Sequence, residues 1–383
     1  MSYDHTISIY LNSNNSKVTG FLNDSKNGLP AIFHSTISVD GMWRGQIKNV
    51  ELVQKSLNKN IEDIKKNLGV KKLSAHISFC PSTLKSTIAN ASVVLTKADG
   101  DVTQRDIERI LGEIERKNTK VNQKILFIEP IRFYLDDALI DGRPEGLKGG
   151  RLGADALVVT TSSQYIKDIE TIMSNFKIDI IDLLPDAVSA SSISLNDRDI
   201  YAGCALINIG NDTTSMTVYN NGALVHVSSY PIGSSDITND IALYFQIDLE
   251  EAENLKNGTF IGNFSQRKID DIVYARLEDI FRIANKDLKI LNLEGLLPAG
   301  VNLTGEGSLI NGAEEIAKKI LKVPVRIASA KNIDPNIKIK DVSWYPSYGF
   351  LNSKSPKKDI HTESDWLKEA KASFKNIFGQ LLP

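Results

Sequence analysis

A polar turn between apolar segments is the first feature of this sequence that could do chemistry. Residues 207–224 read as a strand, a Gly-Asn-Asp turn, a second strand, an Asn-Gly hairpin turn and a third strand. Glycine and asparagine tolerate positive φ, so the amide groups of such a turn can point together at an anion. Many β-hairpins that bind nothing share this pattern. The candidate anion-binding residues are Gly210, Asn211, Asp212, Thr213 and Thr214.

A second strand-to-glycine turn occurs further along the chain, and a helical run follows it at residues 313–321. The residues of this second turn are Gly305, Glu306, Gly307 and Ser308. Glu253 and Lys256 lie between the two turns, at a spacing that usually marks a solvated ion pair on a helix. Two glycine turns in the second half of a long α/β chain resemble the phosphate and adenosine loops of the actin/Hsp70/sugar-kinase superfamily.

The composition is that of an ordinary globular protein. The chain has 383 residues, of which 42% are hydrophobic and 24% charged, and this length suffices for two or three domains. A net charge of −2 gives no electrostatic case for a nucleic-acid partner. Two cysteines, Cys80 and Cys204, are too few for a disulfide framework. Since no signal peptide and no apolar run of about 20 residues occur, we expect a cytosolic protein.

Hydrophobic periodicity predicts alternating strands and helices, which favours an α/β architecture. The expected strands are 7–11, 19–22, 73–79, 124–129, 156–160 and 178–184. The expected helices are 50–68, 102–115, 164–175, one that opens at Pro185, 235–245, 249–257 and 265–291. Residues 352–363 are polar and lack any period, so they read as a flexible linker.

The last residues, 364–382, form an amphipathic pattern at the period of an α-helix. Lysines flank the apolar sector, and polar side chains occupy the opposite face. One interpretation is a final helix that docks on its own domain. The other is a helix that lies in a membrane interface, with aromatic side chains at the boundary. The candidate membrane-binding residues are Trp366, Leu367, Phe374, Ile377, Phe378, Leu381 and Leu382.

With this tail in view, the chain resembles the FtsA family of bacterial actin-like proteins nearly from end to end. The segments that carry the resemblance are 40–47, 102–107, 144–152, 219–226, 233–242 and 253–258, together with the tail. The resemblance implies a two-lobed actin-like fold with an inserted 1C subdomain and a C-terminal amphipathic helix. The implied subdomains are 1A (1–82 and 164–198), 1C (83–163), 2A (199–242 and 300–350) and 2B (243–299).

The resemblance also implies ATP between the lobes, with Mg²⁺ as a possible companion. Amide groups of the turns would hold the triphosphate, Glu253 and Lys256 would lie near the ribose and base, and Gly305, Gly307 and Ser308 would admit the adenosine. The further residues implied at this site are Asn14, Asn15, Ser16 and Lys17 of the first loop, Gly233, and Glu306.

The implied function is that of a polymerising membrane tether of the FtsZ ring in cell division. Filaments of the chain itself would form through 1C, and the C-terminal peptide of FtsZ would dock on 2B. The implied peptide-binding residues are Arg267, Arg276 and Arg282 of one long helix. Other division proteins would be further partners. The implied location is the cytoplasmic face of the inner membrane at the division site, as a peripheral protein.

Three departures from the family pattern fall where acidic residues belong. Asn12 stands at the start of the first phosphate loop, Leu184 precedes the proline of the connecting helix, and Asn208 precedes the second phosphate loop. Carboxylates at these positions would hold hydrated Mg²⁺ or orient the attacking water. We therefore expect weakened ATP binding and very weak ATPase activity or none.

Two other hypotheses compete with this one. The first is an ATP-dependent enzyme of the sugar-kinase or Hsp70 fold, which the missing acids and the missing Hsp70-type substrate domain disfavour. The second is a PilM-like pilus-assembly module that binds a short peptide of an inner-membrane protein. PilM lacks a membrane-seeking tail, so removal of the tail discriminates between the hypotheses.

Overall fold

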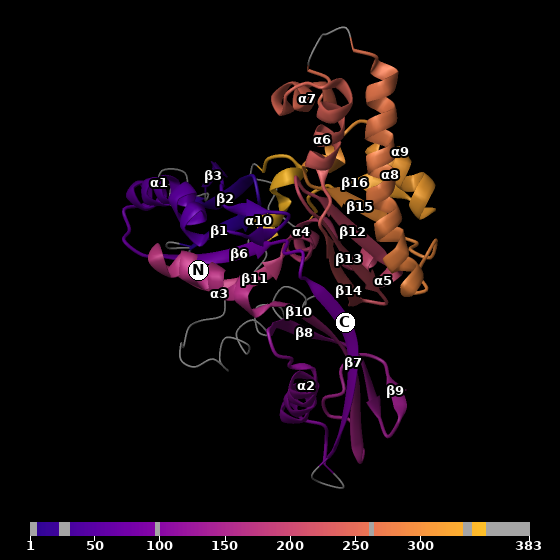
Figure 1. Cartoon of the computed structure of the whole chain (residues 1–383). Coiled ribbons are helices and arrows are strands. Elements are labelled where there is room, and N and C mark those ends of the chain that lie inside the picture. Colours follow the sequence, from indigo (N-terminus) through magenta and orange to yellow (C-terminus); the bar gives the residue numbers. More distant parts are fainter. Residues whose placement is uncertain (1–5, 23–30, 96–99, 260–263, 332–338, 350–383) are drawn as a thin grey trace.

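The computed structural model describes residues 6–22, 31–95, 100–259, 264–331 and 339–349. These residues form two lobes side by side, with one subdomain projecting above the second lobe and another below both (Figure 1). The linker and tail predicted at 352–363 and 364–382 lie outside the described residues. In the part of the chain that is described, no helix is long and apolar enough to cross a bilayer.

The first lobe is built on a five-stranded sheet. In spatial order its strands are β11 (Ile178–Pro185), β6 (Leu73–Phe79), β1 (Thr6–Leu11), β2 (Asn15–Leu22) and β3 (Ala31–Ser38). β1 and β2 form an antiparallel hairpin, and β1, β6 and β11 run parallel. The helices α1 (Val50–Leu68) and α3 (Ser163–Asn175) bury their apolar stripes in the same hydrophobic cluster as this sheet. The short strands β4 (Met42–Trp43) and β5 (Gln46–Ile47) form a hairpin before α1.

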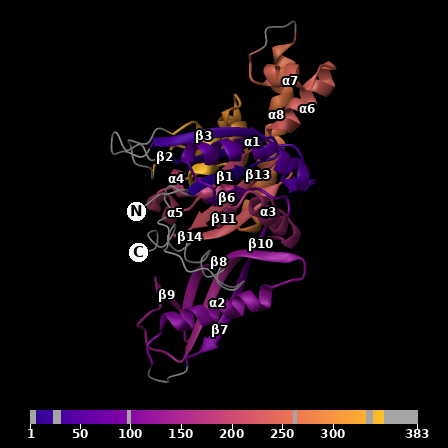
Figure 2. The same cartoon turned by 90° about the vertical axis from the view of Figure 1, so that its left-hand side faces the viewer.

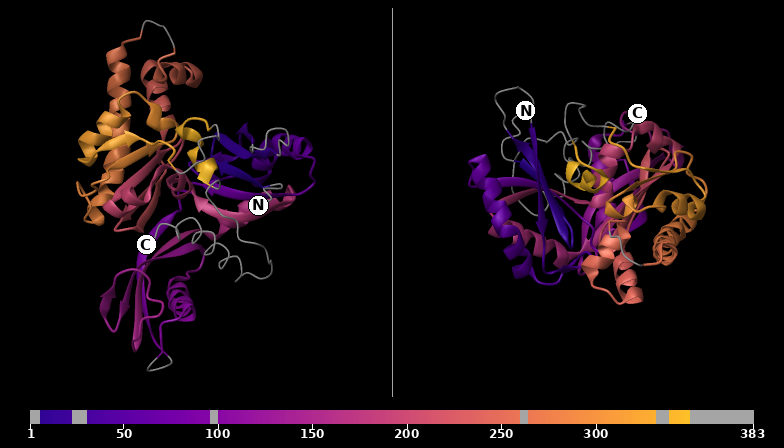
Figure 3. Two further views of the ribbon diagram at one scale, coloured as in Figure 1. Left: turned by 180° about the vertical axis from the view of Figure 1, so that it is seen from behind. Right: turned by 90° about the horizontal axis from the view of Figure 1, so that it is seen from above.

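The second lobe repeats this arrangement. Its sheet contains, in order, β14 (Ala223–Tyr230), β13 (Thr214–Asn220), β12 (Cys204–Ile209), β15 (Val301–Thr304) and β16 (Val325–Ile327). β12, β13 and β14 are antiparallel neighbours, whereas β12, β15 and β16 run parallel, as their counterparts do in the first lobe. The duplication is therefore visible in topology, although no repeat is evident in the sequence. Figure 3 shows the two sheets from above, one in each lobe.

A helical subdomain rises from the second lobe. It consists of α6 (Ser234–Phe245), α7 (Leu249–Lys256) and α8 (Gln266–Ile290), and α8 also packs on α9 (Ala313–Leu321) of the lobe itself. Every third or fourth residue of α8 is buried, including Ile269, Val273, Leu277 and Ile280. This stripe fixes α8 on the lobe and leaves the charged side chains of the helix at its surface.

The inserted subdomain has a small core of its own. Its sheet contains, in order, β7 (Lys85–Val94), β10 (Arg151–Ser162), β8 (Gln123–Leu135) and β9 (Ala138–Ile140). The helix α2 (Gln104–Asn118) lies on one face and buries Ile107, Ile110 and Ile114 against it. Figure 2 shows this subdomain at the end of the molecule opposite to α6 and α7.

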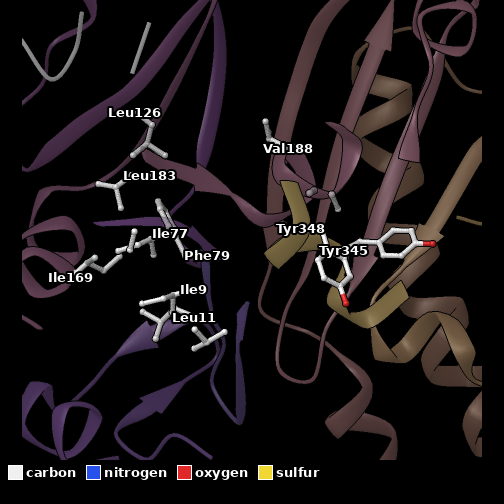
Figure 4. Packing of buried hydrophobic residues seen from close by; sticks show 14 of the residues in the cluster. Ile9, Leu11, Ile77, Phe79, Leu126, Ile169, Leu183, Val188, Tyr345 and Tyr348 are labelled. Atoms are coloured by element: carbon white, nitrogen blue, oxygen red, sulfur yellow. The ribbon is translucent and has the colours of Figure 1, made fainter. Parts of the chain in front are cut away.

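Short elements join the two lobes. The helix α4 (Asp186–Ser194) is buried along its whole length, and α5 (Asp197–Ala202) follows it into the second lobe. The 3₁₀ turn η1 (Glu306–Leu309) follows β15. A second 3₁₀ turn, η2 (Val342–Trp344), leads directly to α10 (Tyr345–Tyr348), which packs on α4 and contacts β1 and β2 of the first lobe. Figure 4 shows Ile9, Ile77 and Phe79 of the first sheet with Ile169 of α3, while Tyr348 of α10 lies beside α4.

Most expected elements are confirmed. The helix predicted at 50–68 and the strand predicted at 73–79 have these bounds in the structure. The helix expected after Pro185 is α4, with the proline at its N-cap. The strands β3 and β7 were not predicted, because their sequences mix polar and apolar residues without regular alternation.

Candidate functional site

The turns that the sequence singles out meet at the junction between the lobes. The β1–β2 turn and the β12–β13 turn occupy equivalent places in the two duplicated sheets. The hydroxyl of Tyr10 near the end of β1 lies 3.4 Å from the amide nitrogen Nδ2 of Asn208 in β12. On the other side of β12, a Cβ added to Gly305 would lie 2.6 Å from Oδ1 of Asn208. Asn208 thus lies between Tyr10 of the first lobe and the turn at residues 305–308.

Asp186 is the centre of this junction. Asp186 is the first residue of α4 and is 1% exposed. Its Oδ1 accepts hydrogen bonds from the amide of Ala187 at 2.7 Å and from the hydroxyl of Ser215 at 2.5 Å. Its Oδ2 accepts from Asn208 Nδ2 at 2.6 Å and from the Tyr10 hydroxyl at 3.2 Å. Burial raises the pKa of Asp186 to about 6, against the opposing effect of these four donors. One carboxylate therefore ties together β1, α4, β12 and β13.

This arrangement explains why an amide stands at position 208. Asn208 Nδ2 donates to Asp186, and an aspartate in its place would put two carboxylates at hydrogen-bond distance in a buried site. Two such groups cannot both ionise without strong repulsion. The carboxylate expected before Pro185 is thus absent, while Asp186 directly after the proline supplies one that is enclosed by protein donors.

Lys17 of β2 is fully engaged by protein acceptors. Its side chain is 5% exposed, and its Nζ donates to Glu306 Oε1 at 3.0 Å, to the carbonyl of Ser343 at 3.0 Å and to the Ser343 hydroxyl at 2.6 Å. Nζ also lies 5.5 Å from the ring centre of Trp344. An ammonium group has three N–H donors, and these three acceptors use all of them.

Asp212 turns away from the space between the turns. Its Oδ1 accepts from Ser235 Oγ at 3.0 Å and from Asn211 Nδ2 at 2.8 Å, and its Oδ2 accepts from the amide of Arg44 at 3.3 Å. The Arg44 guanidinium donates to the carbonyl of Pro231 and, at 2.6 Å, to Asp236 Oδ1. Arg44 lies in the β4–β5 hairpin of the first lobe, so it forms a second bridge to the second lobe.

The start of α6 is closed by the β12–β13 turn. The amides of Ser234 and Ser235 donate to the carbonyls of Gly210 and Asn211 at 2.9 and 2.8 Å. Gly233 is required here, because an added Cβ would lie 2.2 Å from the carbonyl oxygen of Asn211. The amides at this helix start are thus satisfied within the protein. Thr213 of this turn and Thr214 at the start of β13 are buried, and the Thr214 hydroxyl donates to the carbonyl of Ile232 at 2.9 Å.

Gly305 and Gly307 are explained by packing on β12. Gly305 has φ of +85°, and an added Cβ would lie 2.4 Å from the carbonyl oxygen of Ile209. At Gly307 an added Cβ would lie 2.3 Å from the Ile209 side chain. Ser308 is buried and donates to the Gly305 carbonyl at 2.7 Å. The turn therefore needs small residues irrespective of any ligand.

The remaining expected site residues have local roles. Ser16 exchanges hydrogen bonds with the backbone of Asn12, at 3.1 and 3.3 Å. Asn14 is exposed and Asn15 half-buried, and neither has positive φ. Glu253 and Lys256 form an ion pair of 2.7 Å that also binds the hydroxyl of Thr238. Lys256 reaches the carbonyl of Ser234 at 3.4 Å, which joins the pair to the start of α6.

A nucleotide triphosphate does not fit the donors as they stand. All three N–H donors of Lys17 are in use, and the amides of Ser234 and Ser235 are bonded to carbonyls. Among the described residues, no group of three or more histidine, cysteine or carboxylate side chains could hold a metal ion. The groups at the junction bind one another.

The arginines expected to face a peptide lie on α8 with different surroundings. Arg276 is paired with Asp240 of α6, 2.7 Å away, and with Asp279, 3.4 Å away. Arg282 is exposed and donates through Nε to Glu278 at 3.0 Å. Arg267 is exposed at the start of the helix.

Sequence reasoning did not identify Asp186, Tyr10, Arg44 or Ser343 as members of the junction. Asp186 could have been found, because it follows the proline beside which a family carboxylate is expected. The role of Arg44 depends on its contact with Asp236 of the other lobe, and no sequence pattern predicts such a contact.

Family models match two parts of the chain. The cell division protein FtsA model matches residues 205–348, and the model of the SHS2 domain inserted in FtsA matches residues 82–160. The chain is 25% identical over 309 residues to the cell division protein FtsA of Pseudomonas aeruginosa, covering 75% of this chain and 74% of the relative. It is 24% identical over 371 residues to FtsA of Bacillus subtilis, covering 90% of this chain and 82% of the relative.

Solved structures of the same fold also match. The PilM–PilN type IV pilus biogenesis complex has a chain with a TM-score of 0.65 at 14% identity, covering 91% of this chain and 97% of that one. MreB5 of Spiroplasma citri bound to AMPPNP has a TM-score of 0.53 at 14% identity, covering 92% and 96%. These likenesses confirm the expected actin-like fold.

The two matched regions together span more than half of the chain, and they place the inserted subdomain where the structure has the β7–β10 sheet and α2. The two duplicated sheets, the inserted subdomain and the curated relatives all indicate the same family. The chain belongs to the FtsA family of actin-like cell division proteins.

Proposed function

We propose that this protein is a polymerising membrane tether of the FtsZ ring, with a nucleotide site that binds ATP weakly. The observation that carries the proposal is the four-stranded insertion in an actin-like frame, matched by the SHS2 domain inserted in FtsA. The protein acts as a scaffold rather than as an enzyme. Its place is the cytoplasmic face of the cell membrane at the division site, where it also meets other division proteins.

Attachment to lipid is assigned to residues 364–382. Burying a large apolar side chain contributes about 1.5–3 kcal/mol at full burial, so partial insertion of the seven apolar residues named above gives several kcal/mol. Ordering the helix offsets part of this gain. A single tail therefore binds reversibly, and filaments that link several tails bind firmly.

Self-assembly is assigned to the inserted subdomain. The inserted subdomain has a hydrophobic core of its own, and it projects away from the two lobes (Figure 2). Deleting residues 84–163 should abolish filaments on lipid monolayers. Filaments formed by the deleted protein would contradict this assignment.

The peptide of FtsZ is assigned to α8 and its neighbours. Arg267 is exposed and forms no ion pair among the described residues, so its guanidinium can donate two parallel hydrogen bonds to a peptide carboxylate. Arg276 and Arg282 already pair with carboxylates, and a peptide carboxylate would have to exchange with Asp240, Asp279 or Glu278. Arg267 is thus the most available of the three.

ATP binding is weak in this proposal because the donors at the junction are in use. This chain has Asn12, Leu184 and Asn208 where the family pattern has acidic residues, so it lacks carboxylates that hydrated Mg²⁺ would need. We therefore expect no turnover in the usual enzyme range of about 1 per second or faster.

A PilM-like binding module is the second candidate, and the TM-score of 0.65 to a chain of the PilM–PilN complex favours it. The two candidates differ in the tail. Co-sedimentation with anionic vesicles of the full chain and of residues 1–352 tests the choice. Loss of binding on truncation supports the tether, whereas equal sedimentation of both proteins would contradict it.

A further inference from the structure

Two charged bridges cross the junction between the lobes, and each uses a cation of the first lobe. The first joins Lys17 of β2 to Glu306 of η1, with Nζ 3.0 Å from Oε1. The Lys17 side chain is 5% exposed and the Glu306 side chain 36% exposed. Ser343 accepts the two remaining N–H groups of Lys17, so the ammonium is held rigidly as well as neutralised.

The second bridge joins Arg44 of the β4–β5 hairpin to the base of the helical subdomain. Its guanidinium binds Asp236 at 2.6 Å and the carbonyl of Pro231, and its amide binds Asp212. Asp236 is itself fixed, because its Oδ2 accepts from the amide of Gly233 at 2.9 Å. The anchor of the bridge is therefore a rigid helix start.

Both bridges place a protein carboxylate on a cation of the first lobe. Lys17 is the cation of the first loop, and Glu306 and Ser343 saturate it. The amides of Ser234 and Ser235, which could cradle an anion at the start of α6, are satisfied by carbonyls. Beneath them, Asp186 joins Tyr10 of the first lobe to Asn208 of the second.

We propose that these bridges hold the two lobes closed without nucleotide, with Glu306 acting as a built-in substitute for a phosphate on Lys17. The proposal rests on the proposed function, because these bridges lie at the junction where that proposal puts a weak ATP site. The two lobes are then held together by side chains of the protein itself and do not need a nucleotide to close. A nucleotide would have to displace Glu306 from Lys17 before it could bind.

A distance measurement between the lobes tests this. Spin labels on Lys59→Cys of α1 and Glu315→Cys of α9 report the separation by double electron–electron resonance, since both positions are exposed. The native Cys80 and Cys204 are buried and do not compete for the label. The labelled full chain should give one narrow distance distribution that millimolar MgATP leaves unchanged.

Loss of the bridges should broaden this distribution and shift it to longer distances. Lys17→Met with Arg44→Met removes both cations and keeps most of the side-chain volume. Lys318→Met is the matched control, because it breaks a 2.6 Å Lys–Glu pair that lies within α9 alone. The control should keep the distribution of the parent. A parent distance that moves with MgATP, or a bridge variant with the parent's distribution, would overturn the proposal.

Glu306→Gln keeps the test available if the double variant does not fold. It removes the charge that competes for Lys17, so a fluorescent ATP analogue should bind about tenfold more tightly. Unchanged affinity would also overturn the proposal. Vesicle co-sedimentation of the same proteins distinguishes failure of the lobe-closure proposal from failure of the proposed tether function. If the protein binds vesicles but its inter-lobe distance changes with MgATP, only the lobe-closure proposal is wrong.

Discussion

Replacing Asn208 by Asp should destabilise the junction strongly at neutral pH. In the native protein, Asn208 Nδ2 lies 2.6 Å from Oδ2 of Asp186, and both residues are 1% exposed. In the Asn208→Asp variant two carboxylates would face each other. At a separation of about 4 Å and an effective dielectric constant of about 20, their repulsion is about 4 kcal/mol. Uptake of one proton relieves this repulsion, so the loss of stability should shrink as the pH falls.

Urea unfolding at pH 7 and pH 5 measures the effect as a change in the free energy of unfolding. The exchanged double variant, Asp186→Asn with Asn208→Asp, is the matched control, because it restores one carboxylate and one amide. It should recover most of the loss at pH 7. If Asn208→Asp unfolds like the parent at pH 7, or if the exchange rescues nothing, the pairing of these two side chains has been misjudged.

The other predictions concern the pH dependence of stability, the turn at residues 305–308, the C-terminal tail and the peptide site. The folded pKa of Asp186, about 6, exceeds its unfolded value of about 3.9, so the folded state holds more protons between these values and stability falls as pH rises. Asp186→Asn should remove about 2 kcal/mol of this pH dependence between pH 4 and pH 7, measured by urea unfolding. Gly305→Ala should lower the melting temperature more than Gly312→Ala does. Both positions have positive φ, but an added Cβ at Gly305 lies 2.4 Å from a backbone oxygen, whereas the nearest atom at Gly312 is 3.8 Å away; equal effects would exclude the contact as the cause. Trp366→Glu should abolish sedimentation with anionic vesicles, because a carboxylate in the apolar sector outweighs marginal binding, and undiminished sedimentation would exclude the membrane helix. Arg267→Glu should weaken the FtsZ C-terminal peptide at least tenfold, equivalent to about 1.4 kcal/mol, in fluorescence anisotropy, and unchanged affinity would move the peptide site elsewhere.

The frame of this fold could be predicted from the sequence, because hydrophobic periodicity is a local signal. The helix α1 illustrates this, since Val53, Leu57, Ile61 and Ile64 repeat at helical spacing and all are buried. The glycine turns were also located, and the structure brings Gly305 beside Asn208. The duplication of the two sheets was not visible, because it resides in strand order rather than in residue identity.

The chemistry of the junction could not be predicted, because it depends on partners far apart in the chain. Lys17 was expected to face a phosphate, but its acceptors Glu306 and Ser343 lie 289 and 326 residues away in the sequence and become its neighbours only in the folded chain. The effect of Asp212 likewise depends on Ser235 and the amide of Arg44, which turn its charge away. A sequence shows which side chains are charged, and the fold decides which charges are already paired.

The most direct test of the proposed tether is recruitment of the FtsZ C-terminal peptide to membranes by this protein. Fluorescently labelled peptide, anionic vesicles and the full chain are mixed and sedimented, with residues 1–352 as the matched control. The proposal predicts that the peptide sediments with vesicles when the full chain is present and stays in solution with the truncated chain. Peptide that remains in the supernatant with the full chain, while the chain itself sediments, would contradict the account.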